Sequence, residues 1–163
     1  MNIQGNEVQV LISREVYNVL PDEVVEEQYR SLMTQLHGEA SSAVPLQLPA
    51  RLVSDSEIIV FLLYGRRIVS TAQASLATTF PRAHVYINNV VTLASHHRMG
   101  FASEVLRSLQ VAALDRWAET YEQFRFELSN SPKKDNAGFY ARMGFRPRTK
   151  ESGDETVVWV LDV

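Results

Sequence analysis

The sequence of 163 residues contains no cysteine. This absence excludes a disulfide framework, a cysteine nucleophile and a metal site built from thiolates. Long hydrophobic runs are also missing, since no apolar stretch approaches the roughly 20 residues that span a bilayer. The first residues do not combine a charged segment with an apolar core, which is the pattern of a secretory signal. We therefore expect a soluble, cytoplasmic protein that has no membrane partner.

Lys and Arg do not cluster in a long run, and the formal net charge is −3. Proteins that bind nucleic acid need such clusters to neutralise phosphates, so nucleic acid is not expected as a partner. His96 and His97 are adjacent on a predicted turn, where neighbouring residues rarely converge on one ion. Because no third ligand is placed beside them, we expect no metal.

The residues that are present have the composition of an ordinary globular protein. Hydrophobic residues make up 45% of the chain and charged residues 21%, and both values are near the average for soluble domains. The length suits a single domain over residues 1–163 with one hydrophobic core. The sequence contains no internal repeat and no low-complexity segment.

Seven stretches have the alternating or continuous apolar pattern of β-strands. These predicted strands are residues 7–13, 57–64, 67–77, 83–93, 123–129, 145–148 and 156–161. Three stretches have helical spacing, and the first has Pro21 at its start and Gly38 after its end. These predicted helices are residues 21–37, 100–120 and 135–143. Residues 37–51 are compatible either with a loop or with a loop that contains a short helix. Residues 152–154 are predicted to form a hairpin turn.

The order of these elements predicts an α/β fold with a mixed central sheet of about six to seven strands and helices on both faces. Asn88 and Asn89 interrupt the apolar pattern of the strand at residues 83–93. Polar residues inside a buried strand indicate either a β-bulge or an edge that opens toward a ligand.

The start of the helix at Gly100 is the strongest candidate for a binding site. A strand feeds into this helix through a short turn, and the first helical N–H groups have no partners inside the helix. The helix dipole adds partial positive charge there. Gly100 has no Cβ and Ala102 is small, so a diphosphate can approach the backbone closely. We expect the N–H groups of Met99, Gly100, Phe101, Ala102 and Ser103 to point at it.

Two motifs resemble those of the GNAT superfamily of acetyl-CoA-dependent N-acetyltransferases. The family's phosphate loop reads Arg/Gln-x-x-Gly-x-Gly/Ala, and Gly100 and Ala102 match it. His97 stands where the family usually has Arg or Gln, which is a departure from the pattern. The second motif, an aromatic residue and Tyr followed by x-x-x-Gly-Phe, matches closely at residues 139–145. The resemblance in element order extends over nearly the whole chain.

This resemblance implies a GNAT-like fold with a splayed strand pair and acetyl-CoA as cosubstrate. It implies that the pantetheine arm runs along the strand at residues 83–93, which splays from residues 126–129 to make a slot for the thioester. For Arg98, contact with phosphate and simple exposure to solvent are equally expected. The expected cofactor contacts are Val91, Thr92, Leu93, Arg98, Met99, Gly100, Phe101, Ala102, Ser103 and Asn136.

The resemblance also implies a mechanism, in which an amine attacks the acetyl thioester directly. Tyr140 resembles the family's usual proton donor to the departing CoA thiolate. The family often places a Glu base on the central strand, but this chain has Asn88 and Asn89 there. The candidates that remain are Glu127 acting directly, or Glu127 or His84 acting through water. Asn88 or Asn89 would then hold the water or orient the amine.

The acceptor is expected to be a primary amine, with a small molecule favoured over the amino group of a peptide or protein. In such folds residues 37–48 and 148–155 build the acceptor pocket, and Glu151, Asp154 and Glu155 would attract a cationic amine. A non-catalytic acetyl-CoA-binding module is the main alternative. Other nucleotide-binding α/β proteins are disfavoured, because neither Gly-x-Gly-x-x-Gly nor Gly-x-x-x-x-Gly-Lys-Ser/Thr follows a strand. A homodimer is common among members of the superfamily.

Overall fold

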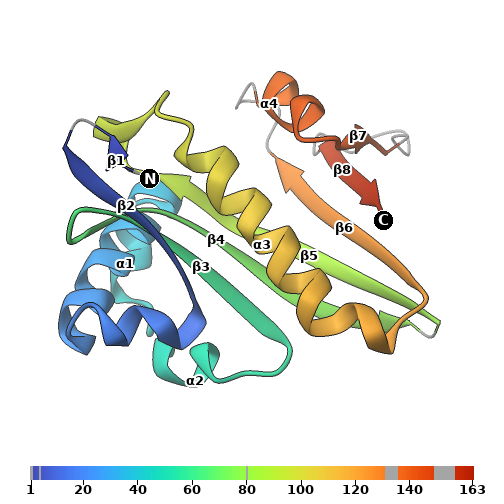
Figure 1. Ribbon diagram of the computed structural model, residues 1–163, viewed down its shortest axis with the longest axis horizontal. Helices are drawn as coiled ribbons and strands as arrows, with labels where there is room; N and C mark the ends of the chain where they lie inside the picture. The colour runs from blue at the N-terminus through green and yellow to red at the C-terminus, as the bar shows by residue number, and fades with distance from the viewer. Residues whose placement is uncertain (1, 4, 80, 131–135, 149–156) are drawn as a thin grey trace.

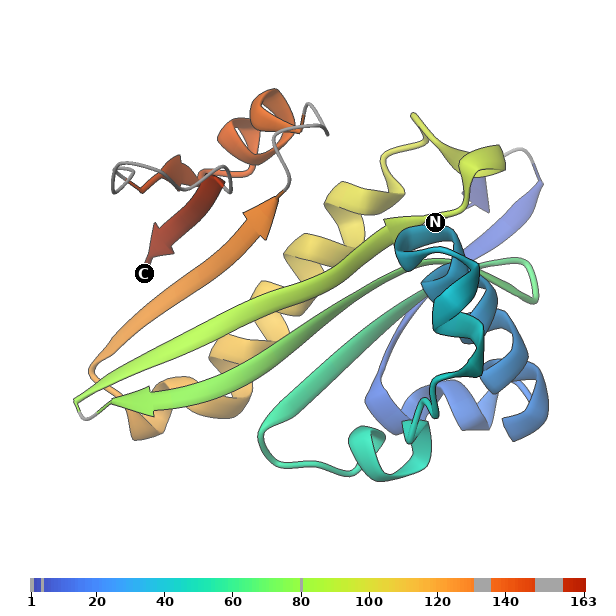
Figure 2. The same cartoon turned by 180° about the vertical axis from the view of Figure 1, so that it is seen from behind.

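The computed structural model describes residues 2–3, 5–79, 81–130, 136–148 and 157–163. Within these residues, eight strands form one sheet in the order β1-β2-β3-β4-β5-β6-β8-β7. Helices cover both faces of this sheet, as Figures 1 and 2 show from opposite sides. The strands are β1 (Asn2–Ile3), β2 (Asn6–Ile12), β3 (Glu57–Tyr64), β4 (Arg67–Thr79), β5 (Arg82–Thr92), β6 (Gln123–Asn130), β7 (Arg146–Pro147) and β8 (Val157–Asp162).

All neighbouring strands pair antiparallel except β5 and β6, which pair in parallel. Parallel strands need a long crossover connection, and α3 (Phe101–Trp117) provides it. This helix crosses one face of the sheet in Figure 1, where it packs on β3 and β4. α1 (Asp22–His37) packs on β4 and β5 from the opposite face.

The remaining helical segments are short. They are η1 (Ser13–Asn18), η2 (Glu39–Ala43), α2 (Leu48–Leu52), η3 (Ala94–His96), η4 (Ala118–Thr120) and α4 (Ala137–Arg142). None of the helices among the described residues is long and apolar enough to cross a membrane.

The hydrophobic core lies between the two helical layers and the sheet. Ile58 to Leu63 on β3 are all buried, although their side chains alternate between the two faces. A strand covered by helices on both sides has no solvent face, which explains its continuous apolar run. On α1 the buried residues Val25, Tyr29, Leu32 and Met33 follow the helical repeat and form one stripe.

The predicted fold class and order of elements are confirmed. The sheet gains one strand over the prediction, because the two-residue β1 pairs with β2. The stretch at 37–51 contains the short helix α2 as well as η2. The helix predicted at 100–120 ends at Trp117 and is followed by the 3₁₀ turn η4. The predicted turn at 152–154 lies outside the described residues.

The sheet has a β-bulge where Asn88 and Asn89 interrupt the apolar pattern. Gln73 on β4 pairs with Asn88, and Thr71 pairs with Val91, so two residues of β5 face one residue of β4. Asn89 adopts a φ of 53°, a left-handed conformation that Asn tolerates better than most residues. The bulge that the two asparagines predicted is therefore present.

The parallel pair β5 and β6 separates just before this bulge. Their pairing begins at Arg82 and Gln123 and stops at Tyr86 and Glu127, although both strands continue. The two ribbons visibly diverge toward the start of α3 in Figures 1 and 2. The predicted splay is confirmed, and it gives β5 an edge that no strand covers among the residues that the structure describes.

Candidate active site

Two neighbouring cavities open where β5 and β6 separate. The first, here called the helix-start cavity, has a volume of about 570 Å³ and is bounded by the end of β5, the start of α3 and the short helix α4. Eight of the ten residues predicted to contact a cofactor line it. They are Val91, Thr92, Arg98, Gly100, Phe101, Ala102, Ser103 and Asn136. Leu93 and Met99 do not line it, because both pack toward the hydrophobic core.

Gly100 lines the helix-start cavity and is the N-cap residue of α3. Its φ of 81° and ψ of 1° lie in the left-handed region, which favours glycine. A Cβ built on Gly100 would meet no atom within 4 Å, so the space above its backbone is open. None of the described side chains caps the helix through a hydrogen bond. The first N–H groups of α3 are thus available to an anion in the cavity.

The two adjacent histidines serve the loop in different ways. The Nε2 atom of His97 lies 2.9 Å from the backbone oxygen of Thr92, which ties the loop to the end of β5. His96 stacks on Phe101 and packs edge-on against Tyr64. The described residues include no group of three or more His, Asp or Glu side chains that could hold a metal ion.

The second cavity, here called the bulge cavity, has a volume of about 320 Å³. It lies between the bulge of β5, the last turn of α1 and the end of β6. Asn88 and His37 both line it. The two cavities share Val90, Asn136 and Tyr140, so they meet at these three residues.

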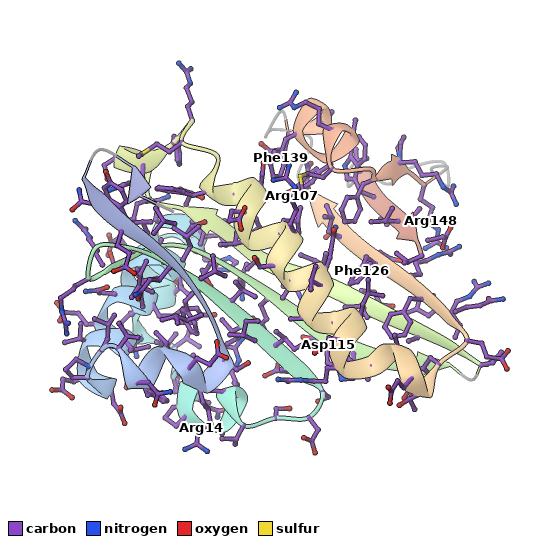
Figure 3. The ribbon with its side chains drawn as sticks, viewed as in Figure 1. Arg14, Arg107, Asp115, Phe126, Phe139 and Arg148 are labelled. Atoms are coloured by element: carbon purple, nitrogen blue, oxygen red, sulfur yellow. The ribbon has the colours of Figure 1, made fainter. Side chains whose placement is uncertain are left out.

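Tyr140 on α4 is 7% exposed and lies at the junction of the two cavities. Its ring packs against Phe139, Phe145 and Trp159, with ring centroids 5.3 to 6.3 Å away. Figure 3 shows Phe139 at the base of α4, above the tip of β6. Burial raises the pKa of Tyr140 above its ordinary value, since a phenolate is costly in apolar surroundings. The phenol therefore stays protonated at neutral pH and can donate a proton.

Glu127 and His84, the predicted bases, line neither of these two cavities. Glu127 pairs with Tyr86 across the parallel ladder, and its carboxylate lies 3.9 Å from Nη1 of Arg148. In Figure 3 Arg148 lies beside β8, far from the start of α3. The ring of His84 stacks on Tyr86. Neither side chain thus belongs to the lining of the bulge cavity.

The sequence indicated that the segment beginning at residue 37 helps to build the acceptor pocket, but no pattern in it marked His37 as a site residue. This side chain contacts Asn89, which is 52 positions away in the chain. No local pattern marks such a contact, because it depends on how α1 packs over β5. A polar residue that ends an amphipathic helix beside the predicted site was the only available signal.

The fold and the two cavities define a class of protein. A profile of the Acetyltransferase (GNAT) family matches residues 21–145, which is most of the chain. The chain therefore belongs to the acetyltransferase (GNAT) family, and it is an acyltransferase. A search of curated proteins found no match.

Solved structures, an N-acetyltransferase among them, have the same fold. The glucosamine-6-phosphate N-acetyltransferase of Arabidopsis thaliana aligns with a TM-score of 0.67 and 14% identity, over 91% of this chain and 97% of that chain. Escherichia coli ElaA aligns with a TM-score of 0.64 and 13% identity, over 95% of this chain and 98% of that chain. Arabidopsis thaliana Naa50, solved with the bisubstrate analogue CoA-Ac-MVNAL, aligns with a TM-score of 0.64 and 16% identity, over 94% of this chain and 97% of that chain.

Proposed function

We propose that the protein transfers an acetyl group from acetyl-CoA directly to a primary amine, with a small molecule as the favoured acceptor. The observation that carries this proposal is the meeting of two cavities at the buried Tyr140. The helix-start cavity has the features of an anion site, namely Arg98 and the start of α3 at Gly100. The described lining of the bulge cavity contains neither Arg nor Lys. A donor and an acceptor could thus approach one another from two sides of a single phenol.

The helix-start cavity fits acetyl-CoA. Its volume of about 570 Å³ lies within the range of roughly 300 to 1,000 Å³ that is usual for small-ligand sites. The open backbone at Gly100 suits a diphosphate, and Arg98 adds positive charge at the cavity wall. Beyond Tyr86 the edge of β5 that faces β6 is unpaired, and such an edge can bind an extended amide chain. Bound acetyl-CoA supplies the reactive acyl thioester.

Tyr140 is proposed to protonate the leaving group. As the amine nitrogen forms a bond to the acetyl carbon, the carbon–sulfur bond breaks, the electron pair remains on sulfur, and the nitrogen releases its extra proton to solvent to leave the neutral amide. Tyr140 then gives its proton to this thiolate and recovers one from solvent. The raised pKa of Tyr140 keeps the proton in place until that moment.

The amine must lose a proton before it attacks, because it is protonated near neutral pH. Glu127, acting through water, remains a candidate base from the sequence. Asn88 lines the bulge cavity and can hold such a water or orient the amine. A carboxamide cannot itself accept the proton, so Asn88 has a positioning role in this scheme.

Turnover by the Tyr140→Phe variant tests the proposed function. Release of free CoA is followed with a panel of small amines, amino sugars and peptides. We expect Tyr140→Phe to lower kcat by about 10²-fold or more, the usual contribution of general acid catalysis, while acetyl-CoA binds as before. The matched control is Tyr121→Phe, because Tyr121 packs on Phe124 at the other end of β6.

The same panel separates the alternatives. A non-catalytic acetyl-CoA-binding module would bind the thioester but release no CoA with any amine. An enzyme for peptide or protein amino groups would acetylate the peptides and not the small amines. The bulge cavity of about 320 Å³ is at the lower end of small-ligand sites, which favours a compact acceptor. If Tyr140→Phe keeps full turnover, its role as the proton donor is wrong.

A further inference from the structure

A chain of hydrogen-bonded side chains crosses the sheet from α2 through β3 and β4 to β5 and ends at the bulge cavity. It joins Arg51 on α2, Glu57 on β3, Gln73 on β4, Asn89 in the bulge and His37 at the end of α1. His37 Nε2 lies 2.8 Å from Asn89 Oδ1, and Asn89 Nδ2 donates to Gln73 Oε1 at 2.9 Å. Arg51 Nη2 donates to the same oxygen of Gln73.

The direction of every bond in this chain follows from Arg51. A guanidinium only donates hydrogen bonds, so the atom of Gln73 that faces it must be the oxygen. The amide nitrogen of Gln73 then donates to Glu57 Oε1 at 3.2 Å, and Arg51 Nε donates to Glu57 Oε2 at 3.4 Å. The oxygen of Gln73 can accept from Asn89 only if Asn89 presents its nitrogen there. Asn89 therefore presents its oxygen to His37.

This arrangement selects one tautomer of His37. Because Asn89 Oδ1 can only accept, the ring nitrogen that faces it, Nε2, must carry the proton. In the neutral ring, Nδ1 is then left with its lone pair. The left-handed backbone of Asn89 in the bulge fixes where this acceptor is presented.

His37 is also in the right place for a base. Among the described residues that line the bulge cavity, His37 and Tyr140 are the only ones with ionisable side chains. Tyr140 is needed as the proton donor in the proposed reaction. His37 is exposed, so a proton that it accepts can pass to solvent.

We infer that His37 accepts the proton of the acceptor amine at Nδ1, and that Asn89, Gln73 and Arg51 position it by holding the proton on Nε2. This inference rests on the proposed function. In the step the nitrogen–hydrogen bond of the ammonium breaks, the electron pair stays on nitrogen, and His37 becomes an imidazolium. Its proton then leaves to water, and the neutral amine attacks the thioester.

The tautomer is measured without any substrate, by ¹⁵N–¹H correlation NMR of the histidine rings of the whole protein. Comparison with the His37→Gln variant assigns the His37 signals. We expect a protonated Nε2 and an unprotonated Nδ1 in the neutral ring. Gln73→Met removes the link to Arg51 and is expected to give a mixture of the two tautomers. A protonated Nδ1 in the wild type would overturn the inference.

The catalytic part is tested by His37→Gln. The amide nitrogen of glutamine can replace Nε2 as the donor to Asn89, but the side chain offers no base. We expect kcat to fall by about 10²-fold or more, while KM for the amine and the melting temperature change little. Glu27→Gln, an exposed change on the same helix α1 that lines neither cavity, is the matched control and should keep wild-type turnover.

The outcomes separate this inference from the proposed function. If the wild type acetylates amines and His37→Gln does so equally well, the inference is wrong and the proposed function stands. Loss of turnover in Glu127→Gln with full turnover in His37→Gln would assign the base to Glu127 instead. If the wild type acetylates no amine, the proposed function and the catalytic role of His37 both fail, and the NMR spectra still decide the tautomer.

Discussion

Replacing Gly100 by alanine tests the backbone anion site directly. The residue sits at a φ of 81°, where an L-residue costs roughly 1–2 kcal/mol relative to glycine. An added Cβ would meet no atom within 4 Å, so backbone strain alone should set the loss of stability. In a domain of this size, that loss lowers the melting temperature by about 2–8 °C.

The effect on acetyl-CoA should be larger than this strain. The new methyl group would stand in the open space through which a diphosphate reaches the N–H groups of α3. Losing one charge-assisted hydrogen bond costs roughly 1.5–3 kcal/mol, and each 1.4 kcal/mol is a factor of ten in affinity. We therefore expect Gly100→Ala to bind acetyl-CoA about 10- to 100-fold more weakly, as measured by isothermal titration calorimetry.

Gly5 offers a matched control for the strain. It lies in the turn between β1 and β2, has a φ of 79°, and a Cβ there would also meet nothing within 4 Å. Gly5→Ala should lower the melting temperature to a similar degree and leave acetyl-CoA binding unchanged. If the two variants lose the same stability and both bind acetyl-CoA like the wild type, the diphosphate does not bind at Gly100 and the reasoning is refuted.

Three further predictions concern stability and pH. Asp162 pairs with Arg125 and Arg146, which hold its pKa below the ordinary value. Asp162→Asn should therefore cost about 1 kcal/mol or less at pH 7, and in urea unfolding this difference should vanish as the pH falls below about 4 and Asp162 gains a proton. Phe61 is fully buried, and Phe61→Ala should lower the free energy of unfolding by about 3–5 kcal/mol. Burial raises the pKa of Tyr140, so kcat should not fall through loss of its proton below about pH 10; a falling limb near pH 8 that Tyr140→Phe abolishes would contradict this.

The parts of the fold that were predictable from sequence have local signals. The continuous apolar run of β3 and the amphipathic repeat of α1 are visible in short windows. Two adjacent asparagines marked the bulge because they break the apolar pattern of the strand, and in the structure Asn88 is exposed and Asn89 half-buried. By contrast, β1 has only two residues and gains its stability from pairing with β2, so no local pattern predicts it.

The cofactor side of the site was also more predictable than the acceptor side. Gly100 and Ala102 lie in one continuous segment, the N-cap and first turn of α3, whose chemistry follows from a helix start. The acceptor side depends on contacts between distant segments, such as that of His37 with Asn89. Glu127 was reasonable from its place on β6, but the register places it beside Tyr86 and away from the cavity lining. Residue type alone cannot reveal such a register.

The backbone oxygen of Thr92 joins three segments that are separate in the sequence. It accepts hydrogen bonds from Gln35 on α1 and from His97 in the loop before α3, both at 2.9 Å. The side-chain oxygen of Gln35 also accepts from the backbone N–H of Ala94 at 3.2 Å. The loop cannot shift without breaking these bonds unless the last turn of α1 travels with it. If acetyl-CoA binds as proposed, a displacement of this loop would therefore also move the last turn of α1, which lines the bulge cavity.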